Sequence, residues 1–234
     1  MLFRNQKKIL TGRFFLFTLD NKVLFMNDVS RSLNTLQDIK QMMEQSSRFI
    51  SLSGFSGMAA GVCALIGAWY ANTILPANLE TLSSSSDKIS IFEILESPFL
   101  KAAVVTFVSA FIFAFLFTYM RSKKNGTPVW SATSKRLLLN VSVPMIVGAI
   151  FLIKLVQNGN YGLVAPGCLI FYGLALINAG KYTLGEIRYL GFAEVVTGLV
   201  SLFVVGYGLY FWAFGFGFLH IFYGSLMWWK YERN

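Results

Sequence analysis

Two ionisable side chains, Glu194 and His220, interrupt the longest apolar stretch of the chain, residues 189–229. Inside a membrane an ionisable residue is costly, and such residues commonly mark ion pathways or proton relays. A buried carboxylate that faces an imidazole can relay a proton or bind a cation. The same two groups can instead satisfy each other and hold two helices together. The pattern leaves both interpretations open.

Pairing of these residues requires the apolar stretch to fold back on itself. One helix of about 40 residues would be about 60 Å long, which is twice the thickness of the hydrocarbon core. The segment with Gly206 and Gly208 is the natural place for a turn. A hairpin that turns there places Glu194 and His220 at similar depth in two antiparallel helices.

A second pattern concerns helix packing. Ser53, Gly57 and Gly61 follow one another at four-residue intervals at the start of the first long apolar run. Small residues on one face of a membrane helix let another helix approach closely. We therefore predict that this face packs against a second helix, either within one chain or in a homo-oligomer.

Signals of enzyme chemistry are absent from the sequence. There is a single histidine, the acidic residues do not cluster inside the apolar runs, and no metal-protease, nucleophile-elbow or phosphate-loop motif occurs. Cys63 and Cys168 each lie inside an apolar run, without the spacing of a disulfide framework or a metal site. We expect no enzyme, no catalytic residues, no cofactor and no metal.

The composition indicates which environment must hold these residues. Of 234 residues, 55% are hydrophobic and 13% are charged, whereas soluble domains carry about 25% charged residues. A soluble domain of this length could not hide so much apolar surface from water. The net charge of +9 comes largely from basic clusters that flank apolar runs, which favours a membrane topology signal over nucleic-acid binding.

Runs of about 20 apolar residues are long enough to cross the hydrocarbon core. They predict an all-α membrane protein, a bundle of about six transmembrane helices with a cytoplasmic tail at 230–234. The predicted spans are residues 54–75, 98–120, 137–156, 161–179, 189–206 and 209–229.

Orientation follows from the charges of the loops. The loop after the second span holds five basic residues and no acid between 121 and 136, whereas the loop at 76–97 holds one lysine and four acids. Basic loops face the cytoplasm in membrane proteins. Because basic connections alternate with acidic or neutral ones, both termini are predicted to be cytoplasmic.

The region before the first span differs from the rest. The sequence of residues 1–27 is typical of a hairpin-like or poorly ordered extension, and Met26 is a candidate alternative first residue of the protein. Residues 28–53 show apolar positions at three- to four-residue spacing, typical of an amphipathic cytoplasmic helix. Its apolar face would lie on the membrane, pack on the bundle, or bind a protein partner through residues 30–46.

Residues 47–54, the aromatic-rich final hairpin and the short basic tail resemble uncharacterised conserved bacterial multi-pass membrane proteins. The resemblance covers about residues 28–234. It implies a bacterial inner (plasma) membrane and no particular chemistry.

Two functional hypotheses follow. The scarcity of charge inside the spans favours a non-enzymatic sensor, scaffold or accessory subunit that acts through its cytoplasmic helix. The alternative is a small transporter or channel that uses Glu194 and His220. The expected surroundings are the lipid bilayer, with a protein partner or a second copy as further possibilities and no nucleic acid.

Overall fold

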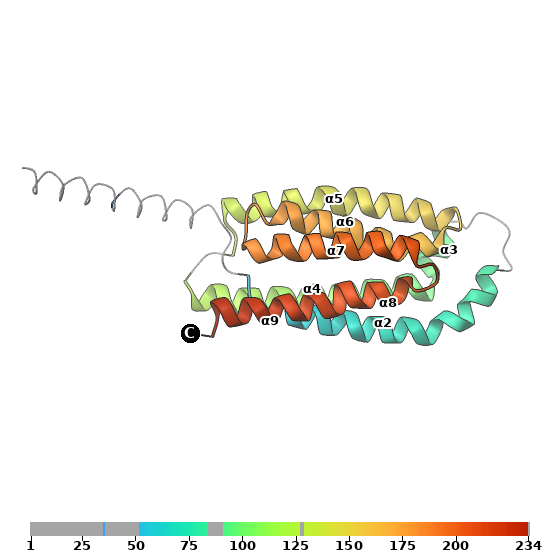
Figure 1. Cartoon of the computed structure of the whole chain (residues 1–234), viewed down its shortest axis with the longest axis horizontal. Helices are drawn as coiled ribbons and strands as arrows, with labels where there is room; N and C mark the ends of the chain where they lie inside the picture. Colours follow the sequence, from blue (N-terminus) through green and yellow to red (C-terminus); the bar gives the residue numbers. More distant parts are fainter. Residues whose placement is uncertain (1–34, 36–51, 84–90, 127–128, 234) are drawn as a thin grey trace, which may run out of the picture. The chain divides into compact units, whose positions relative to one another are not determined.

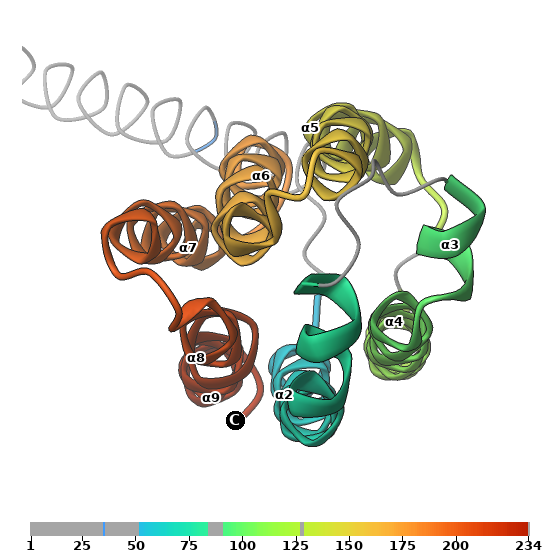
Figure 2. The same cartoon turned by 90° about the vertical axis from the view of Figure 1, so that its right-hand side faces the viewer.

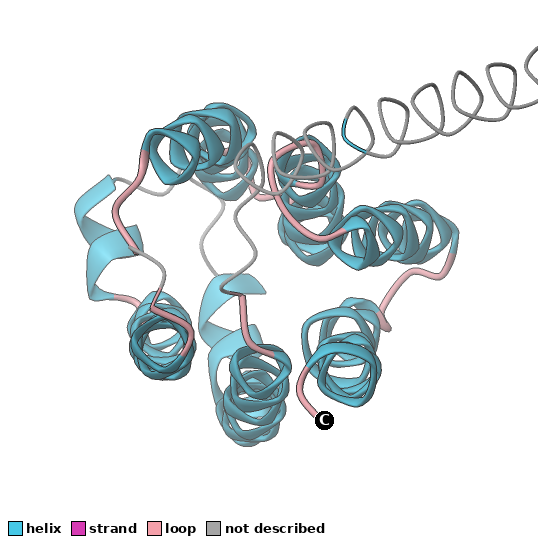
Figure 3. Ribbon diagram, turned by 90° about the vertical axis from the view of Figure 1, so that its left-hand side faces the viewer, coloured by secondary structure: helices cyan, strands magenta, loops and turns pink. Residues whose placement is uncertain are grey.

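The computed structural model describes residues 35, 52–83, 91–126 and 129–233. The chain divides into two units, Met1–Ser47 and Arg48–Asn234. The predicted extension at 1–27 and nearly all of the predicted amphipathic helix at 28–53 lie outside the described residues. Within the described residues every regular element is helical and no strand occurs, which confirms the predicted all-α class (Figure 3).

The elements of the second unit are α2 (Gly54–Ser83), α3 (Ile91–Glu96), α4 (Pro98–Lys124), α5 (Ala132–Gln157), the 3₁₀ turn η1 (Tyr161–Leu163), α6 (Val164–Ala179), α7 (Gly185–Phe203), α8 (Gly208–Trp212), the π-helical segment η2 (Ala213–Leu219) and α9 (His220–Tyr231).

Five helical stretches in the described part of the chain are long and apolar enough to cross a membrane. They are Gly54–Ile74, Pro98–Lys124, Ala132–Gln157, Tyr161–Ala179 and Gly208–Tyr231. These stretches correspond to the first four predicted spans and to the last one. The remaining predicted span, residues 189–206, corresponds to α7. This helix is less apolar than the others because it carries Glu186, Arg188 and Glu194 within 19 residues.

Within the second unit the long helices run side by side (Figure 1). The end-on view in Figure 2 shows α5, α6 and α7 on one side, and α8–α9, α2 and α4 on the other. Helix α6 packs against both α5 and α7, and α2 packs against both α4 and α9. The α8–η2 stretch joins the two sets because it contacts α6, α7 and α2.

The chain turns sharply at residues 204–207, between α7 and α8. Gly206 has φ +90°, a left-handed backbone conformation that glycine adopts without the strain imposed by a Cβ atom. This turn coincides with the glycine-containing segment predicted from the sequence. It makes α7 and the α8–α9 stretch antiparallel neighbours, which is the condition for their central residues to meet.

The predicted small-residue face packs within the chain. A Cβ atom added at Gly57 would lie 3.2 Å from the Cα atom of Gly224 in α9, and one added at Gly61 would lie 2.7 Å from the carbonyl oxygen of Gly217 in η2. Glycine at these positions therefore lets the two backbones approach closely. Ser53 lies directly before α2 and is buried, and its hydroxyl group donates a hydrogen bond to Glu232.

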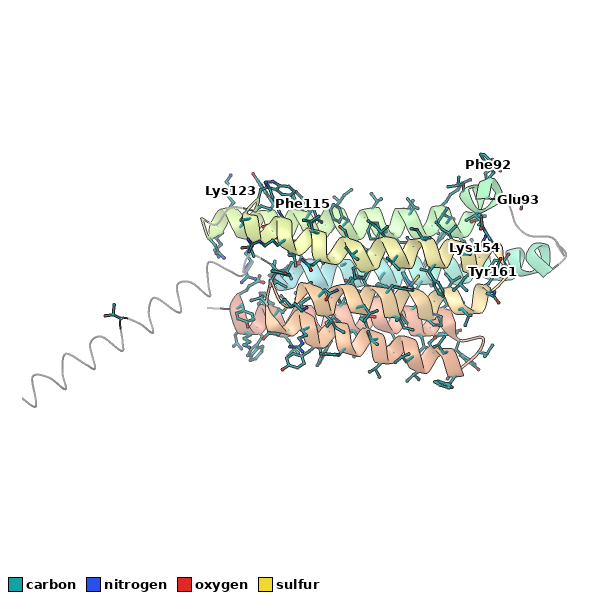
Figure 4. All side chains as sticks on the ribbon, turned by 90° about the horizontal axis from the view of Figure 1, so that it is seen from above. Phe92, Glu93, Phe115, Lys123, Lys154 and Tyr161 are labelled. Carbon is teal, nitrogen blue, oxygen red and sulfur yellow. The ribbon has the colours of Figure 1, made fainter. Side chains whose placement is uncertain are left out.

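The sides and ends of the bundle differ in chemistry. Figure 4 shows Lys123 at one end, and Glu93, Lys154 and Tyr161 at the other. Along α4 four stacked rings leave half or more of their surface exposed: Phe107, Phe111, Phe115 and Tyr119. Large apolar side chains exposed along a helix of this length suit a hydrocarbon solvent rather than water.

Candidate functional site at the centre of the bundle

Glu194 is the central residue of α7, and its side chain is 0% exposed. The helix presents it on the same face as Thr197 and Ser201, which follow at the spacing of one helical face and are also buried. Because the face also carries Gly191 and Gly198, α6 approaches α7 closely. A Cβ atom at Gly191 would lie 2.7 Å from the carbonyl oxygen of Gly173. The carboxyl group is therefore held deep between tightly packed helices.

His220 lies near the middle of the last candidate span and is buried. Its Nδ1 atom is 3.3 Å from Oε1 of Glu194 and 3.1 Å from the carbonyl oxygen of Gly215. Its Nε2 atom is 2.8 Å from the hydroxyl oxygen of Tyr172 in α6. A carbonyl oxygen only accepts hydrogen bonds, so Nδ1 carries the proton that reaches Gly215. The hydrogen bond between Nε2 and the Tyr172 hydroxyl group can run in either direction, because a hydroxyl group both donates and accepts.

The π-helical segment η2 brings the backbone against the carboxyl group. A Cβ atom at Gly215 would lie 2.5 Å from Oε2 of Glu194 and 2.4 Å from Cδ2 of Leu169. Only glycine fits this contact without displacement of its neighbours. π-helical turns inside α-helices are rare and often occur at functional sites, and this one ends at the residue before His220.

The rings of Tyr172 and Phe216 lie beside the imidazole. The ring of Phe216 lies 4.9 Å from the ring of Tyr172, 5.0 Å from that of Trp212 and 6.0 Å from that of His220, measured between centroids. Packing of this kind excludes water and lowers the local dielectric constant, which strengthens electrostatic interactions among the buried groups.

The side chains of Glu194 and His220 are close but are not hydrogen-bonded to each other. Neither oxygen of Glu194 has a hydrogen-bond partner among the described residues. The 3.3 Å approach to His220 lies within ion-pair distance. The Nδ1 proton, however, is directed at the Gly215 carbonyl, so proximity does not amount to a hydrogen bond. A buried carboxyl group without donors is costly, and an added proton would lower that cost by neutralising it.

The arrangement suits proton binding better than metal binding. The described part of the chain contains no group of three or more His, Cys, Asp or Glu residues that could hold a metal ion. Glu194 and His220 together can hold a proton as a neutral pair or as an ion pair. Tyr172 extends this chain of groups into α6 through its hydrogen bond to His220.

Sequence reasoning anticipated part of this site. The structure brings Glu194 and His220 together across α7 and α9, as the hairpin hypothesis required. Tyr172 and Gly215 were missed. A tyrosine near mid-depth in the fourth span was a usable signal, but the sequence does not reveal which way its helix faces. Gly57 in α2 lies beside the backbone of His220, because a Cβ atom there would lie 3.4 Å from the carbonyl oxygen of His220.

A second polar cluster lies where the bundle begins and ends. The carboxylate of Glu232 accepts hydrogen bonds from the hydroxyl group of Ser53, at 3.3 and 3.2 Å, and from the backbone N–H of Gly54. It also pairs with Arg121 at 2.7 Å, and Arg121 donates to the carbonyl oxygen of Leu52. Glu232 thus acts at the N-terminus of α2 as a capping carboxylate supplied by the end of the chain.

A surface ion pair lies near this cluster. Glu186, in the first turn of α7 and ahead of the predicted 189–206 span, accepts hydrogen bonds from Lys230 at 2.6 Å and from the hydroxyl group of Tyr231. Partial burial by itself raises the pKa of Glu186, but these hydrogen bonds and the positive charge of Lys230 outweigh it, and the net effect lowers the pKa.

No protein-family model, no curated protein and no solved structure matches the chain. The resemblance to uncharacterised bacterial multi-pass membrane proteins, drawn from residues 28–234, therefore stays a prediction.

Proposed function

We propose that the chain is a six-span membrane protein in which α7 is the sixth crossing helix. Helix α7 contacts α6, η2 and α9, and its 19 residues give a length of about 28 Å, close to the hydrocarbon thickness. Two of its three charges, Glu186 and Arg188, lie in or just after its first turn, which we place at the membrane surface, outside the hydrocarbon core. The concentration of basic residues at the Lys123 end supports cytoplasmic termini, and the resemblance supports a bacterial inner membrane.

The proposed activity is that of a small transporter or channel in which Glu194 and His220 handle a proton or another cation. One observation carries this proposal. Glu194 is fully buried at the centre of α7, and neither of its oxygens has a hydrogen-bond partner among the described residues. A structural ion pair would be expected to use those oxygens, whereas a site that must bind and release a cation keeps them available. Ionisable groups at this depth typically belong to ion or proton pathways.

Proton flux across reconstituted vesicles tests the proposal. The purified chain is placed in liposomes that contain a pH-sensitive dye, and a potassium diffusion potential is applied with valinomycin. We expect proton entry above the rate of protein-free liposomes, and a loss of at least tenfold with Glu194→Gln. Glu186→Gln is the matched control, because it removes the same charge from the same helix outside the central site. Equal rates for the wild type and Glu194→Gln would refute the proposal.

A second candidate is the sensor, scaffold or accessory subunit that acts through residues 30–46. The observation that favours it is the separation of Met1–Ser47 from Arg48–Asn234 as a unit of its own. A chain lacking residues 30–46 is compared with the full chain in pull-downs from native membranes, with mass spectrometry of the bound proteins. The hypothesis predicts a partner that the full chain retains and the shortened chain loses. A partner retained by both chains would contradict it.

A further inference from the structure

The face of α7 that carries Glu194 is polar on one side of this residue and apolar on the other. Towards the 204–207 turn, the next positions on the face are Thr197 and Ser201, both buried. Towards the beginning of α7, the corresponding positions are Gly191 and Ile187, with Leu190 beside them, and all three are buried. On this face of α7, hydroxyl groups therefore occur only between Glu194 and the turn.

The hydroxyl groups on this face can form further hydrogen bonds. The Thr197 hydroxyl donates to the carbonyl oxygen of Ala193 at 2.8 Å, which leaves its oxygen free to accept a hydrogen bond. The Ser201 hydroxyl is buried and has no hydrogen-bond partner among the described residues. Beyond Ser201 the helix ends, and Val205 in the turn is 86% exposed. Thr197 and Ser201 are four residues apart, about 6 Å along the helix, and neither hydroxyl group is hydrogen-bonded to the other or to Glu194. A proton that moves from the turn to Glu194 along these groups therefore needs a bridging water molecule at each gap.

The opposite direction is closed by packed side chains. Ile187 belongs to an apolar cluster with Ala179, Leu184 and Met227, drawn from the end of α6, the start of α7 and the end of α9. Leu52, Leu137, Val141 and Leu176 pack against this cluster. A close-packed apolar layer offers no hydrogen-bonding group along which a proton could move. The face of α7 thus carries hydroxyl groups between Glu194 and the turn, and apolar side chains between Glu194 and the beginning of the helix.

The packing around Glu194 also selects the ion. A metal cation such as Na⁺ or Ca²⁺ needs several oxygen ligands around it at once, but the backbone of Gly215 lies directly against the carboxyl group, and Leu169 lies against the same glycine. A proton needs only one oxygen and almost no room. The titratable groups that face Glu194 are His220 from α9 and Tyr172 from α6, while η2 faces it with the backbone of Gly215.

We infer that Glu194 binds a proton that arrives from the 204–207 turn along the hydroxyl groups of Ser201 and Thr197, while the apolar cluster blocks exchange with the other end. In the binding step a hydronium ion transfers one proton to the carboxylate, which leaves a neutral carboxylic acid and a water molecule. The inference rests on the proposed function and specifies its ion and its direction of entry. The turn is at the end predicted to face away from the cytoplasm.

Infrared difference spectroscopy of the reconstituted protein tests this inference without any transported substrate. Lowering the pH should produce the carbonyl band of a protonated carboxylic acid, and Glu194→Gln should remove it. In D₂O the shift of this band reports how fast water exchanges the acid proton. We expect the double variant Thr197→Val, Ser201→Ala to slow that exchange at least tenfold. Ser201→Thr, which keeps the hydroxyl group, should exchange at the wild-type rate and shows that any slowing is not due to misfolding.

Ser142→Ala is the matched control for the hydroxyl deletions, because its hydroxyl group donates to the Leu138 carbonyl oxygen within α5. It should leave the exchange rate unchanged. A band that survives Glu194→Gln, or a double variant that exchanges at the wild-type rate, would overturn the inference. The proposed transport is judged separately by vesicle flux. Flux that needs Glu194 but not the two hydroxyl groups would keep the transport proposal and remove the route.

Discussion

Replacement of Glu194 by methionine distinguishes a structural ion pair from a site kept available for a proton. Methionine is similar in length to glutamate and carries no charge. In the structure, His220 does not depend on Glu194, since its ring nitrogens already pair with the Gly215 carbonyl oxygen and the Tyr172 hydroxyl group. Removal of the carboxyl group therefore leaves no other described group without a partner.

The expected size of the effect follows from that geometry. A buried polar group without partners costs about 1–3 kcal/mol, and a volume-conserving change in a packed core costs less than about 1.5 kcal/mol. Glu194→Met should therefore stabilise the bundle by about 1 kcal/mol. For a chain of this size that corresponds to a rise in Tm of about 2–4 °C. If Glu194 and His220 instead formed a structural ion pair, removal of one partner would cost about 3–5 kcal/mol.

Thermal unfolding in lipid nanodiscs, followed by intrinsic tryptophan fluorescence, measures the difference. Tyr172→Phe is the counterpart, because it removes the hydroxyl group that pairs with Nε2 of His220 and should lower stability by about 1 kcal/mol. The two variants are expected to shift the Tm in opposite directions, although both change the central site. In the vesicle assay Glu194→Met should lose proton flux despite its higher stability. A clear fall in the Tm of Glu194→Met would refute the reasoning.

Two further predictions concern the end of the bundle where the chain terminates. Glu232→Ala should destabilise the second unit by about 1–3 kcal/mol, because it removes the ion-pair partner of the partly buried Arg121 and the capping carboxylate of α2; the loss is measured by thermal unfolding. As the pH is lowered, the stability of Glu186→Gln should fall less than that of the wild type. The lowered pKa of Glu186 means that its contribution is complete above the ordinary value of 4.5 and is lost as the pH falls through the lowered value; unfolding temperatures between pH 7 and pH 3 measure this.

Each of these variants has a control. Lys123→Ala removes an exposed charge from the last turn of α4 and should leave the Tm unchanged, in contrast to Glu232→Ala. The counterpart of Glu186→Gln is Lys230→Ala, which removes the other partner of the ion pair and should change the acid-side profile in the same way. A Glu232→Ala variant as stable as Lys123→Ala would show that the carboxylate does not cap α2. Parallel acid profiles for Glu186→Gln and the wild type would show that the pair with Lys230 contributes nothing to folding.

Much of the fold follows from local properties of the chain. The length of an apolar run sets the length of a spanning helix, and this rule placed five of the six predicted spans on helices that are long and apolar enough to cross a membrane, and the sixth on α7. The turn at 204–207 was predictable because an uninterrupted helix would be twice the bilayer thickness and glycines lie at its middle. Once that turn was assumed, the equal depth of Glu194 and His220 followed from counting residues.

The rotation of each helix about its axis could not be predicted from the sequence. Hydropathy reports where a helix begins and ends, but an almost uniformly apolar helix gives little indication of which face meets a neighbour. The position of Tyr172 against His220, and of Gly215 against Glu194, depends on that rotation and on the π-helical turn in η2. The lack of donors around Glu194, which carries the functional proposal, is visible only in the folded arrangement.

Contacts between distant parts of the chain were likewise decided by the tertiary structure. Ser53 has the small size expected of a packing residue, yet its hydroxyl group donates to Glu232, 179 positions away. By itself the sequence indicated a hydrocarbon environment rather than water, the helical class, the lengths of the helices and the place of the final turn. Each of these depends on residues that are neighbours in the chain. The tertiary structure alone decided which buried groups meet and which stay unpaired, because those outcomes depend on how separate helices rotate and pack against one another.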